Sequence, residues 1–132
     1  MPPPGSSPVR VVVTDANILI NLIHVGRLDL LGKLPPYSFV VPEEVVKEVK
    51  DPSQAEALQT AISSGLLQEV QLVDPAELTV YADLIQILGS GEAACLSLAQ
   101  CRQWLIASDE KKRFEQHRFM MSFRSFREVL PP

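Results

Sequence analysis

The sequence contains little of what export or membrane insertion would require. Its most apolar stretch, residues 9–23, is interrupted by Arg10, Asp15, Asn17 and Asn21, whereas a membrane-spanning helix needs about 20 mainly apolar residues in a row. Residues 1–8 have no apolar signal core, so we expect them to form a flexible leader rather than a signal peptide. These absences predict a soluble, cytoplasmic protein.

Cysteine is also scarce. Cys95 and Cys101 are the only two, and they are six positions apart in a segment expected to be helical, which would separate their Cα atoms by about 9 Å. That distance is too great for a disulfide. Neither cysteine has the neighbours of a metal or redox motif, and two thiols fit a reducing cytoplasm. We expect both to be core residues.

Two common kinds of site have no counterpart in the sequence. A glycine-rich phosphate loop of the Walker type is missing, which argues against nucleoside triphosphate chemistry. Paired cysteines or histidines at zinc spacing are missing too, which argues against a zinc site. The two histidines, His24 and His117, are isolated along the chain, and we expect them at surface or packing positions.

Charge is unevenly distributed along the chain. The net charge is −4, yet residues 111–132 contain six basic and two acidic residues, a balance of +4 that leaves −8 for the remainder. An acidic body with a basic C-terminal patch could bind metal through the acids and phosphates through the patch. The simpler alternative is that the basic residues lie on the solvated faces of two short helices.

The length of 132 residues and the apolar fraction of 46% fit a single domain, which we place at residues 9–132. Short β-branched or apolar runs predict strands at residues 9–14, 37–41, 67–73, 104–108 and 118–122. Helical spacing predicts helices at residues 16–23, 27–33, 43–50, 54–63, 75–88, 92–101, 110–117 and 125–130. Strands that alternate with helices predict an α/β fold with a mainly parallel sheet.

Three acidic residues are expected at one edge of this sheet. Asp15 directly follows the first predicted strand, and Asp109 follows the strand at 104–108. Glu92 begins the helix that leads into that strand, and such a helix runs antiparallel to the strand, so its start lies at the same edge. Ligands of parallel sheets bind at this edge. Each acid alone could instead be a helix cap or a partner of a helix dipole.

The helix after the second predicted strand offers further acids, Glu43, Glu44 and Glu48. Glu48 borders the apolar face of this helix more closely, whereas Glu44 lies nearer the helix start, so the helical wheel leaves the choice open. Carboxylates crowded at one edge raise each other's pKa and need a counter-charge. Their hard oxygens favour Mg²⁺ or Mn²⁺.

Four segments in order resemble the PIN-domain family: VVVTDANILI (11–20), VPEEVVKEV (41–49), GSGEAACLSLA (89–99) and LIASDEKKR (105–113). The resemblance covers residues 11–130. It implies a three-layer α/β/α sandwich with about five strands, and a Mg²⁺- or Mn²⁺-dependent endoribonuclease similar to the toxins of VapC-type toxin–antitoxin pairs. RNA, an antitoxin protein and a second copy of the chain are the partners it implies.

The resemblance also assigns roles to individual residues. The catalytic quartet is Asp15, Glu48, Glu92 and Asp109, of which Asp15, Glu92 and Asp109 are the metal ligands. Asn17 and Ser108 support the quartet with polar side chains. Lys111, Lys112 and Arg113 match basic residues that hold the RNA backbone.

Two other functions compete with this one. A PIN-like domain could bind RNA or protein without cleavage, although a degenerate site would usually have lost one of the acids. A receiver-like phosphoacceptor domain also places an aspartate at a strand end, but it leaves Glu92 without a role. The number of metal ions, one or two, and the RNA target stay open.

Overall fold

The computed structural model describes residues 9–108 and 120–122. Its strands are β1 (Arg10–Thr14), β2 (Tyr37–Pro42), β3 (Gln68–Val70), β4 (Leu105–Ser108) and β5 (Met120–Ser122). They form one five-stranded sheet in the order β3-β2-β1-β4-β5, and all four neighbouring pairs are parallel. The expected α/β fold with a mainly parallel sheet is therefore confirmed.

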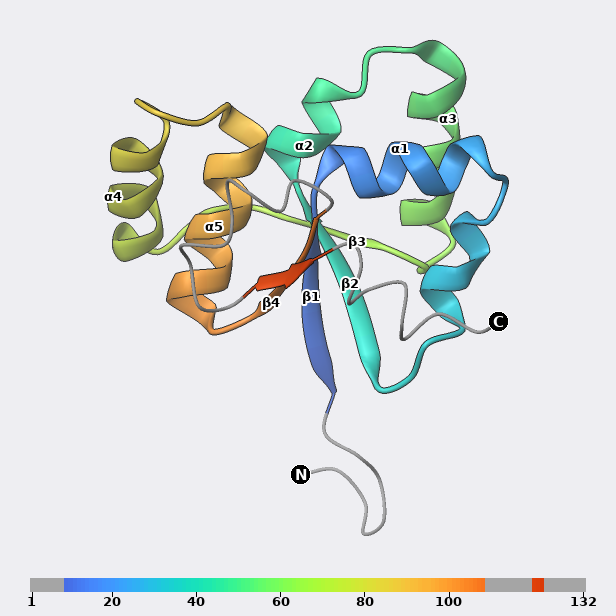
Figure 1. Cartoon of the computed structure of the whole chain (residues 1–132), viewed down its shortest axis with the longest axis horizontal. Coiled ribbons are helices and arrows are strands. Elements are labelled where there is room, and N and C mark those ends of the chain that lie inside the picture. The colour runs from blue at the N-terminus through green and yellow to red at the C-terminus, as the bar shows by residue number, and fades with distance from the viewer. Residues whose placement is uncertain (1–8, 109–119, 123–132) are drawn as a thin grey trace, which may run out of the picture.

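Helices cover both faces of the sheet. They are α1 (Ala16–His24), the 3-10 helix η1 (Leu28–Gly32), α2 (Glu43–Glu48), α3 (Pro52–Ser63), α4 (Pro75–Leu84) and α5 (Ser90–Arg102). Figure 1 shows α4 and α5 on one side of the strands and α1, η1 and α3 on the other. This arrangement gives the three expected layers. Among the described helices, none has both the length and the apolar character needed to cross a membrane.

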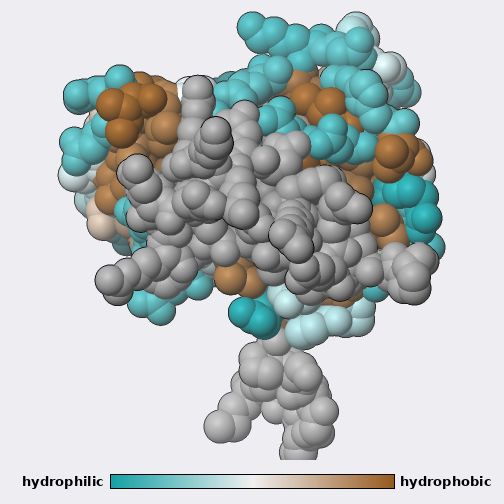
Figure 2. Space-filling model, viewed as in Figure 1, coloured by the Kyte–Doolittle hydropathy of each residue, from teal (hydrophilic) through white to brown (hydrophobic). Residues whose placement is uncertain are grey.

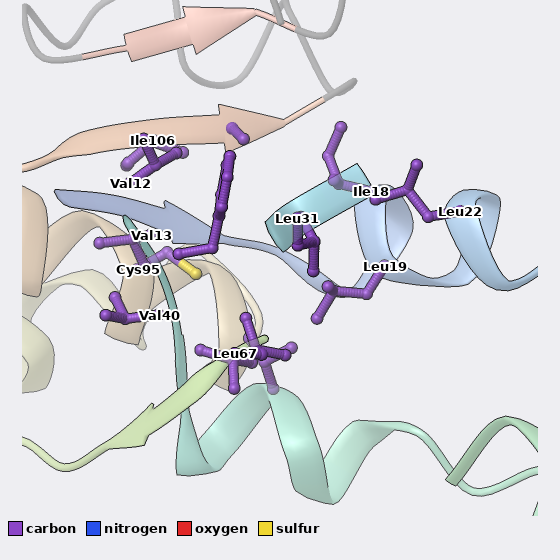
Figure 3. Packing of buried hydrophobic residues seen from close by; sticks show 14 of the residues in the cluster. Val12, Val13, Ile18, Leu19, Leu22, Leu31, Val40, Leu67, Cys95 and Ile106 are labelled. Carbon is purple, nitrogen blue, oxygen red and sulfur yellow. The ribbon is translucent and has the colours of Figure 1, made fainter. Parts of the chain in front are cut away.

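The middle strand of the sheet, β1, is buried on both faces. Val12 and Val13 point to opposite faces because side chains alternate along a strand, and both are fully buried. Figure 3 shows them within a cluster of apolar side chains contributed by the sheet and by helices from both layers. A short β-branched strand of this kind is typical of a parallel sheet covered on both sides.

The strand register brings the carboxyl ends of β1, β2 and β4 to one level. Thr14 pairs with Ala107 of β4, and Val13 pairs with Val40 of β2. The buried Thr14 hydroxyl donates a hydrogen bond to the Val40 carbonyl at 2.9 Å, which ties the ends of β1 and β2 together. Figure 1 shows the N-terminal ends of α1, α2 and α5 gathered at this same edge.

Two predicted elements are shorter than expected, and for the strand the cause is side chains that bind the backbone groups beyond its end. The strand predicted at 67–73 is only β3, since beyond it the Gln71 carbonyl accepts a hydrogen bond from Arg102 and the Val73 amide donates one to Glu77. The helix predicted at 75–88 ends at Leu84, and residues 85–87 form a turn.

Two further expectations were wrong in detail. The helix predicted at 27–33 is the short 3-10 helix η1, which is usual for a brief connector, here one that soon meets Pro35. Cys95 is buried as expected, but Cys101 is exposed. Six positions along a helix turn through 600°, which leaves the two thiols about 120° apart around the axis. Only one of them faces the sheet.

The surface around α4 retains exposed apolar side chains. Val73, Leu78, Ile85 and Ile87 are 41–78% exposed, and they lie on α4 or within a few residues of its ends. Figure 2 shows apolar surface at the upper left, where Figure 1 places α4 and α5. Neighbouring exposed apolar residues of this kind are typical of surfaces that bind another protein.

Candidate active site

A cleft of about 230 Å³ lies at the carboxyl end of the sheet. Its lining comes from three elements that are far apart in the sequence: the junction of β1 and α1, the end of α2 and the first turn of α5. The lining residues are Asp15, Ala16, Asn17, Glu48, Gly91 and Glu92. Three carboxylates and one carboxamide therefore face a common space.

Asp15 is buried, with only 3% of its surface exposed. It is the N-cap of α1, and its Oδ1 accepts a hydrogen bond from the Ile18 amide at 3.0 Å. Its own amide donates to the Ala107 carbonyl of β4 at 3.3 Å. The capping role considered as an alternative thus applies, and it fixes the carboxylate at the cleft.

Glu48 is the last residue of α2, and its side chain is exposed at the cleft. Its Oε1 accepts a hydrogen bond from the Gly91 amide at 2.7 Å and one from the Ser90 hydroxyl at 3.3 Å. Both donors lie in the first turn of α5. The end of one helix is therefore joined to the start of another across the cleft.

The other acids of α2 point elsewhere. Glu43 forms an ion pair with Lys47 at 3.0 Å and accepts a hydrogen bond from Gln71. Glu44 is half-buried, and its Oε1 is enclosed without a hydrogen-bond partner within the part of the chain described. It lies toward α4: burial raises the pKa of Tyr81, and the charge of Glu44 adds to that rise.

The helical wheel left the choice between these glutamates open, and in the structure Glu44 is half-buried whereas Glu48 is exposed. Glu48, not Glu44, lines the cleft with Asp15 and Glu92.

The negative charges of these acids also affect the pKa of Cys95, a buried residue. Burial raises the pKa of the Cys95 thiol well above its usual range, and the carboxylates of Asp15, Glu48, Glu44 and Glu92 raise it further. Cys95 also donates a weak hydrogen bond to the Thr14 carbonyl, at 3.6 Å. Both effects favour the protonated thiol, which is a poor nucleophile.

A family model described as a PIN domain matches residues 11–117. The chain belongs to the PIN-domain family. The match spans all four segments that suggested the resemblance, and it removes the receiver-like alternative. No match was found among curated proteins.

Three solved structures have a similar fold. A chain of VapBC-1 from nontypeable Haemophilus influenzae has a TM-score of 0.63 at 12% identity, covering 86% of this chain and 98% of its own. A chain of a toxin–antitoxin complex from Klebsiella pneumoniae has a TM-score of 0.62 at 20% identity, covering 84% of this chain and 96% of its own. A chain of VapBC2 from Rickettsia felis, bound to a DNA fragment from its promoter, has a TM-score of 0.60 at 17% identity, covering 85% of this chain and 98% of its own.

The structure brings together three of the four acids assigned to the PIN-type quartet: Asp15, Glu48 and Glu92. Asn17 lines the same cleft, and Ser108 is the last residue of β4. The remaining assigned residues, Asp109, Lys111, Lys112 and Arg113, lie outside the described residues. Within the described residues, no three His, Cys, Asp or Glu side chains are grouped closely enough to hold a metal ion.

Two residues that contact Glu48 were missed from the sequence, namely Ser90 and Gly91. In the sequence, the run Gly89-Ser90-Gly91 belongs to the segment that resembles PIN domains, and the helix is expected to begin only at residue 92. The position of this run directly before Glu92 is the feature that could have pointed to the cleft, because the first turn of that helix was already expected at the acidic edge.

Proposed function

We propose that this PIN domain is a Mg²⁺- or Mn²⁺-dependent endoribonuclease that hydrolyses RNA phosphodiester bonds. The observation that carries the proposal is the cleft, where Asp15, Glu48 and Glu92 approach from three separate elements. The cleft lies at the carboxyl end of a parallel sheet, the usual place for a ligand in such folds. Membership of the PIN family makes a nuclease the natural use of these acids.

The chemistry of the donors fits a hard divalent cation. Carboxylate oxygens prefer Mg²⁺ or Mn²⁺, and the described lining residues of the cleft include no sulfur or imidazole that would favour a softer metal. Asp15 and Glu92, together with Asp109, would hold the ion. Bound there, the ion would activate water for attack on the phosphodiester and stabilise the leaving oxygen.

The residues of the chain supply position and charge. The N-cap hydrogen bond restrains the buried carboxylate of Asp15, and the hydrogen bonds from α5 restrain that of Glu48. A ligand in the cleft thus meets groups that are already ordered, which lowers the entropic cost of assembling the reacting geometry. Lys111, Lys112 and Arg113 would hold the RNA backbone, and Asn17 and Ser108 would support the acids.

The test is cleavage of a mixed RNA pool with Mg²⁺ or Mn²⁺. We expect the wild-type chain to cut, and each of Asp15→Asn, Glu92→Gln and Asp109→Asn to lower the rate by about 100-fold or more. Glu56→Gln is the matched control, since this glutamate is exposed on α3 and does not line the cleft. Equal rates in all these proteins would refute the proposal.

The same assay decides between the two glutamates of α2. Because Glu48 lines the cleft and Glu44 does not, Glu48→Gln should abolish cleavage while Glu44→Gln keeps most of it. The reverse result would place Glu44 in the catalytic set.

One observation favours the alternative of RNA or protein binding without cleavage: among the described residues, no three acids are grouped closely enough to hold a metal. If the wild-type chain binds single-stranded RNA but does not cut it with Mn²⁺ supplied, that alternative holds and the nuclease proposal fails.

We also propose an antitoxin protein and a second copy of the chain as partners. The solved structure from Klebsiella pneumoniae is a toxin–antitoxin complex, and the exposed apolar side chains around α4 support a protein-binding surface on this chain.

A further inference from the structure

We infer that Gly91 is a positioning residue for Glu48, through both its amide and its missing side chain. The role of Glu48 at the cleft rests on the proposed function. That the start of α5 sets where the Glu48 carboxylate lies rests only on the contacts between the two groups.

The first step is the pair of hydrogen bonds. Glu48 is exposed, and a long exposed side chain without partners would sample many rotamers. Here its Oε1 accepts from the Gly91 amide at 2.7 Å and from the Ser90 hydroxyl at 3.3 Å. The Gly91 amide belongs to the first turn of the 13-residue helix α5, where backbone N–H groups have no partner within the helix. The carboxylate supplies that partner from another element.

The second step is steric. A Cβ added at Gly91 would lie 2.6 Å from Oε2, 2.7 Å from Oε1 and 2.8 Å from Cδ of Glu48. Real Cβ atoms do not come this close to other heavy atoms, so one of the two groups must move. Gly91 is buried in a helix, whereas the carboxylate is the far end of a flexible, exposed side chain. Glu48 would therefore swing away and lose its hydrogen bonds.

The backbone conformation at Gly91 does not itself require glycine. Positive φ values occur at Gly26, Gly65 and Gln103 among the described residues, and Gly91 is not one of them. Alanine also favours helix more than glycine does. Gly91→Ala should therefore leave the fold intact and act on the contact with Glu48.

Gly89 provides a matched control two residues earlier. It is the N-cap of α5 with φ −66°, and a Cβ added there meets nothing within 4 Å. Gly89→Ala thus makes the same chemical change beside the same helix without touching Glu48.

The first experiment uses the metal-free protein and needs no RNA. In an amide ¹H–¹⁵N NMR spectrum, we expect Glu48→Gln to shift the Gly91 amide proton upfield, because a hydrogen bond to a charged acceptor is replaced by a weaker one. Glu56→Gln should leave that resonance in place. An unchanged Gly91 amide in Glu48→Gln would overturn the inference, whatever the protein does with metal or RNA.

The second experiment measures Mn²⁺ binding through the EPR signal of free Mn²⁺. Glu48 is not among the proposed ligands, but its carboxylate lines the same cleft as Asp15 and Glu92 and would add to the attraction for the ion. We therefore expect Gly91→Ala to bind Mn²⁺ about tenfold more weakly than wild type, a usual cost of losing a group that orients a carboxylate around a metal site, with Gly89→Ala near wild type. In a Glu48→Ala background, the effect of Gly91→Ala should disappear, because no carboxylate remains to be displaced.

The outcomes separate the two proposals. If wild type binds Mn²⁺ and Gly91→Ala binds it equally well, or if the Gly91→Ala effect persists without the Glu48 side chain, the inference fails and the nuclease proposal is untouched. If wild type binds no Mn²⁺, the proposed metal dependence fails, while the NMR result still decides whether Gly91 holds Glu48.

Discussion

An ion pair between α4 and α5 gives the sharpest prediction for stability. Glu77 is buried, with 3% of its surface exposed, and its two oxygens accept from Arg102 Nε at 2.6 Å and Nη2 at 3.0 Å. Its Oε1 also accepts from the amides of Val73 and Asp74, which completes a capping box at the start of α4. Each of these hydrogen bonds stabilises the charged carboxylate of Glu77.

The magnitude follows from the pKa of Glu77. The hydrogen bonds from Arg102, opposed by burial and aided by the two backbone amides, lower this pKa from 4.5 to about 2. At about 1.36 kcal/mol per pKa unit, this is worth about 3 kcal/mol of folding free energy. Because the folded pKa lies below the unfolded one, the contribution is complete above about pH 5 and is lost as the pH falls toward 2.

The perturbation is Glu77→Gln, which mimics the protonated acid. At pH 7 we expect the free energy of unfolding to fall by about 3 kcal/mol, and the gap between variant and wild type to close as the pH is lowered. Urea unfolding can be followed by the fluorescence of Trp104, the only tryptophan, whose ring lies 4.8 Å from the Arg102 guanidinium carbon. Far-UV circular dichroism provides a second probe of the same transition.

Glu69→Gln serves as the control, because Glu69 is exposed on the edge strand β3. The unfolding midpoint of this variant should match that of the wild type. A gap below about 1 kcal/mol between Glu77→Gln and wild type at pH 7 would show that the pair contributes far less than the pKa of Glu77 implies. A gap that does not change with pH would refute the electrostatic explanation.

Two further predictions concern the thiols and the assembly. A thiol reagent should modify the exposed Cys101 at once and the buried Cys95 only on unfolding. The reason is that burial and the nearby acids raise the pKa of the Cys95 thiol and so favour its protonated form. Equal rates of modification at the two thiols would contradict the described packing. Light scattering on the purified protein should give about twice the chain mass of 14.6 kDa, and a single-chain mass would count against the proposed homodimer.

The layers of the fold could be predicted because each strand has its own local pattern. The run at residues 9–14 is rich in β-branched residues and is bounded by Pro8 and Asp15, and β1 within it is the central strand of the sheet. The lengths of β3 and α4 could not be predicted in the same way. The end of β3 depends on Arg102 and Glu77, which lie far apart in the sequence and bind backbone groups between β3 and α4.

The acidic edge could be predicted because chain direction alone places strand ends and helix starts. That reasoning put Asp15 and Glu92 together without any knowledge of strand order, and the cleft contains both. The wheel of α2 left the choice between Glu44 and Glu48 open because a wheel describes one helix and omits its neighbours. Hydrogen bonds from the first turn of α5 hold Glu48 at the cleft.

Helix α5 contacts Glu48 at one end and Glu77 at the other, and these two contacts can be perturbed separately. Its last residue, Arg102, binds Glu77, whereas its first turn binds Glu48. Because the Glu48 contact is made by an exposed side chain, losing it should change the cleft with little effect on stability. Because Glu77 does not line the cleft, losing its charge should lower stability and leave Mn²⁺ affinity unchanged at pH 7. If Glu77→Gln weakened Mn²⁺ binding while the protein remained folded, α5 would have to shift as a rigid body, and the two ends would not be independent.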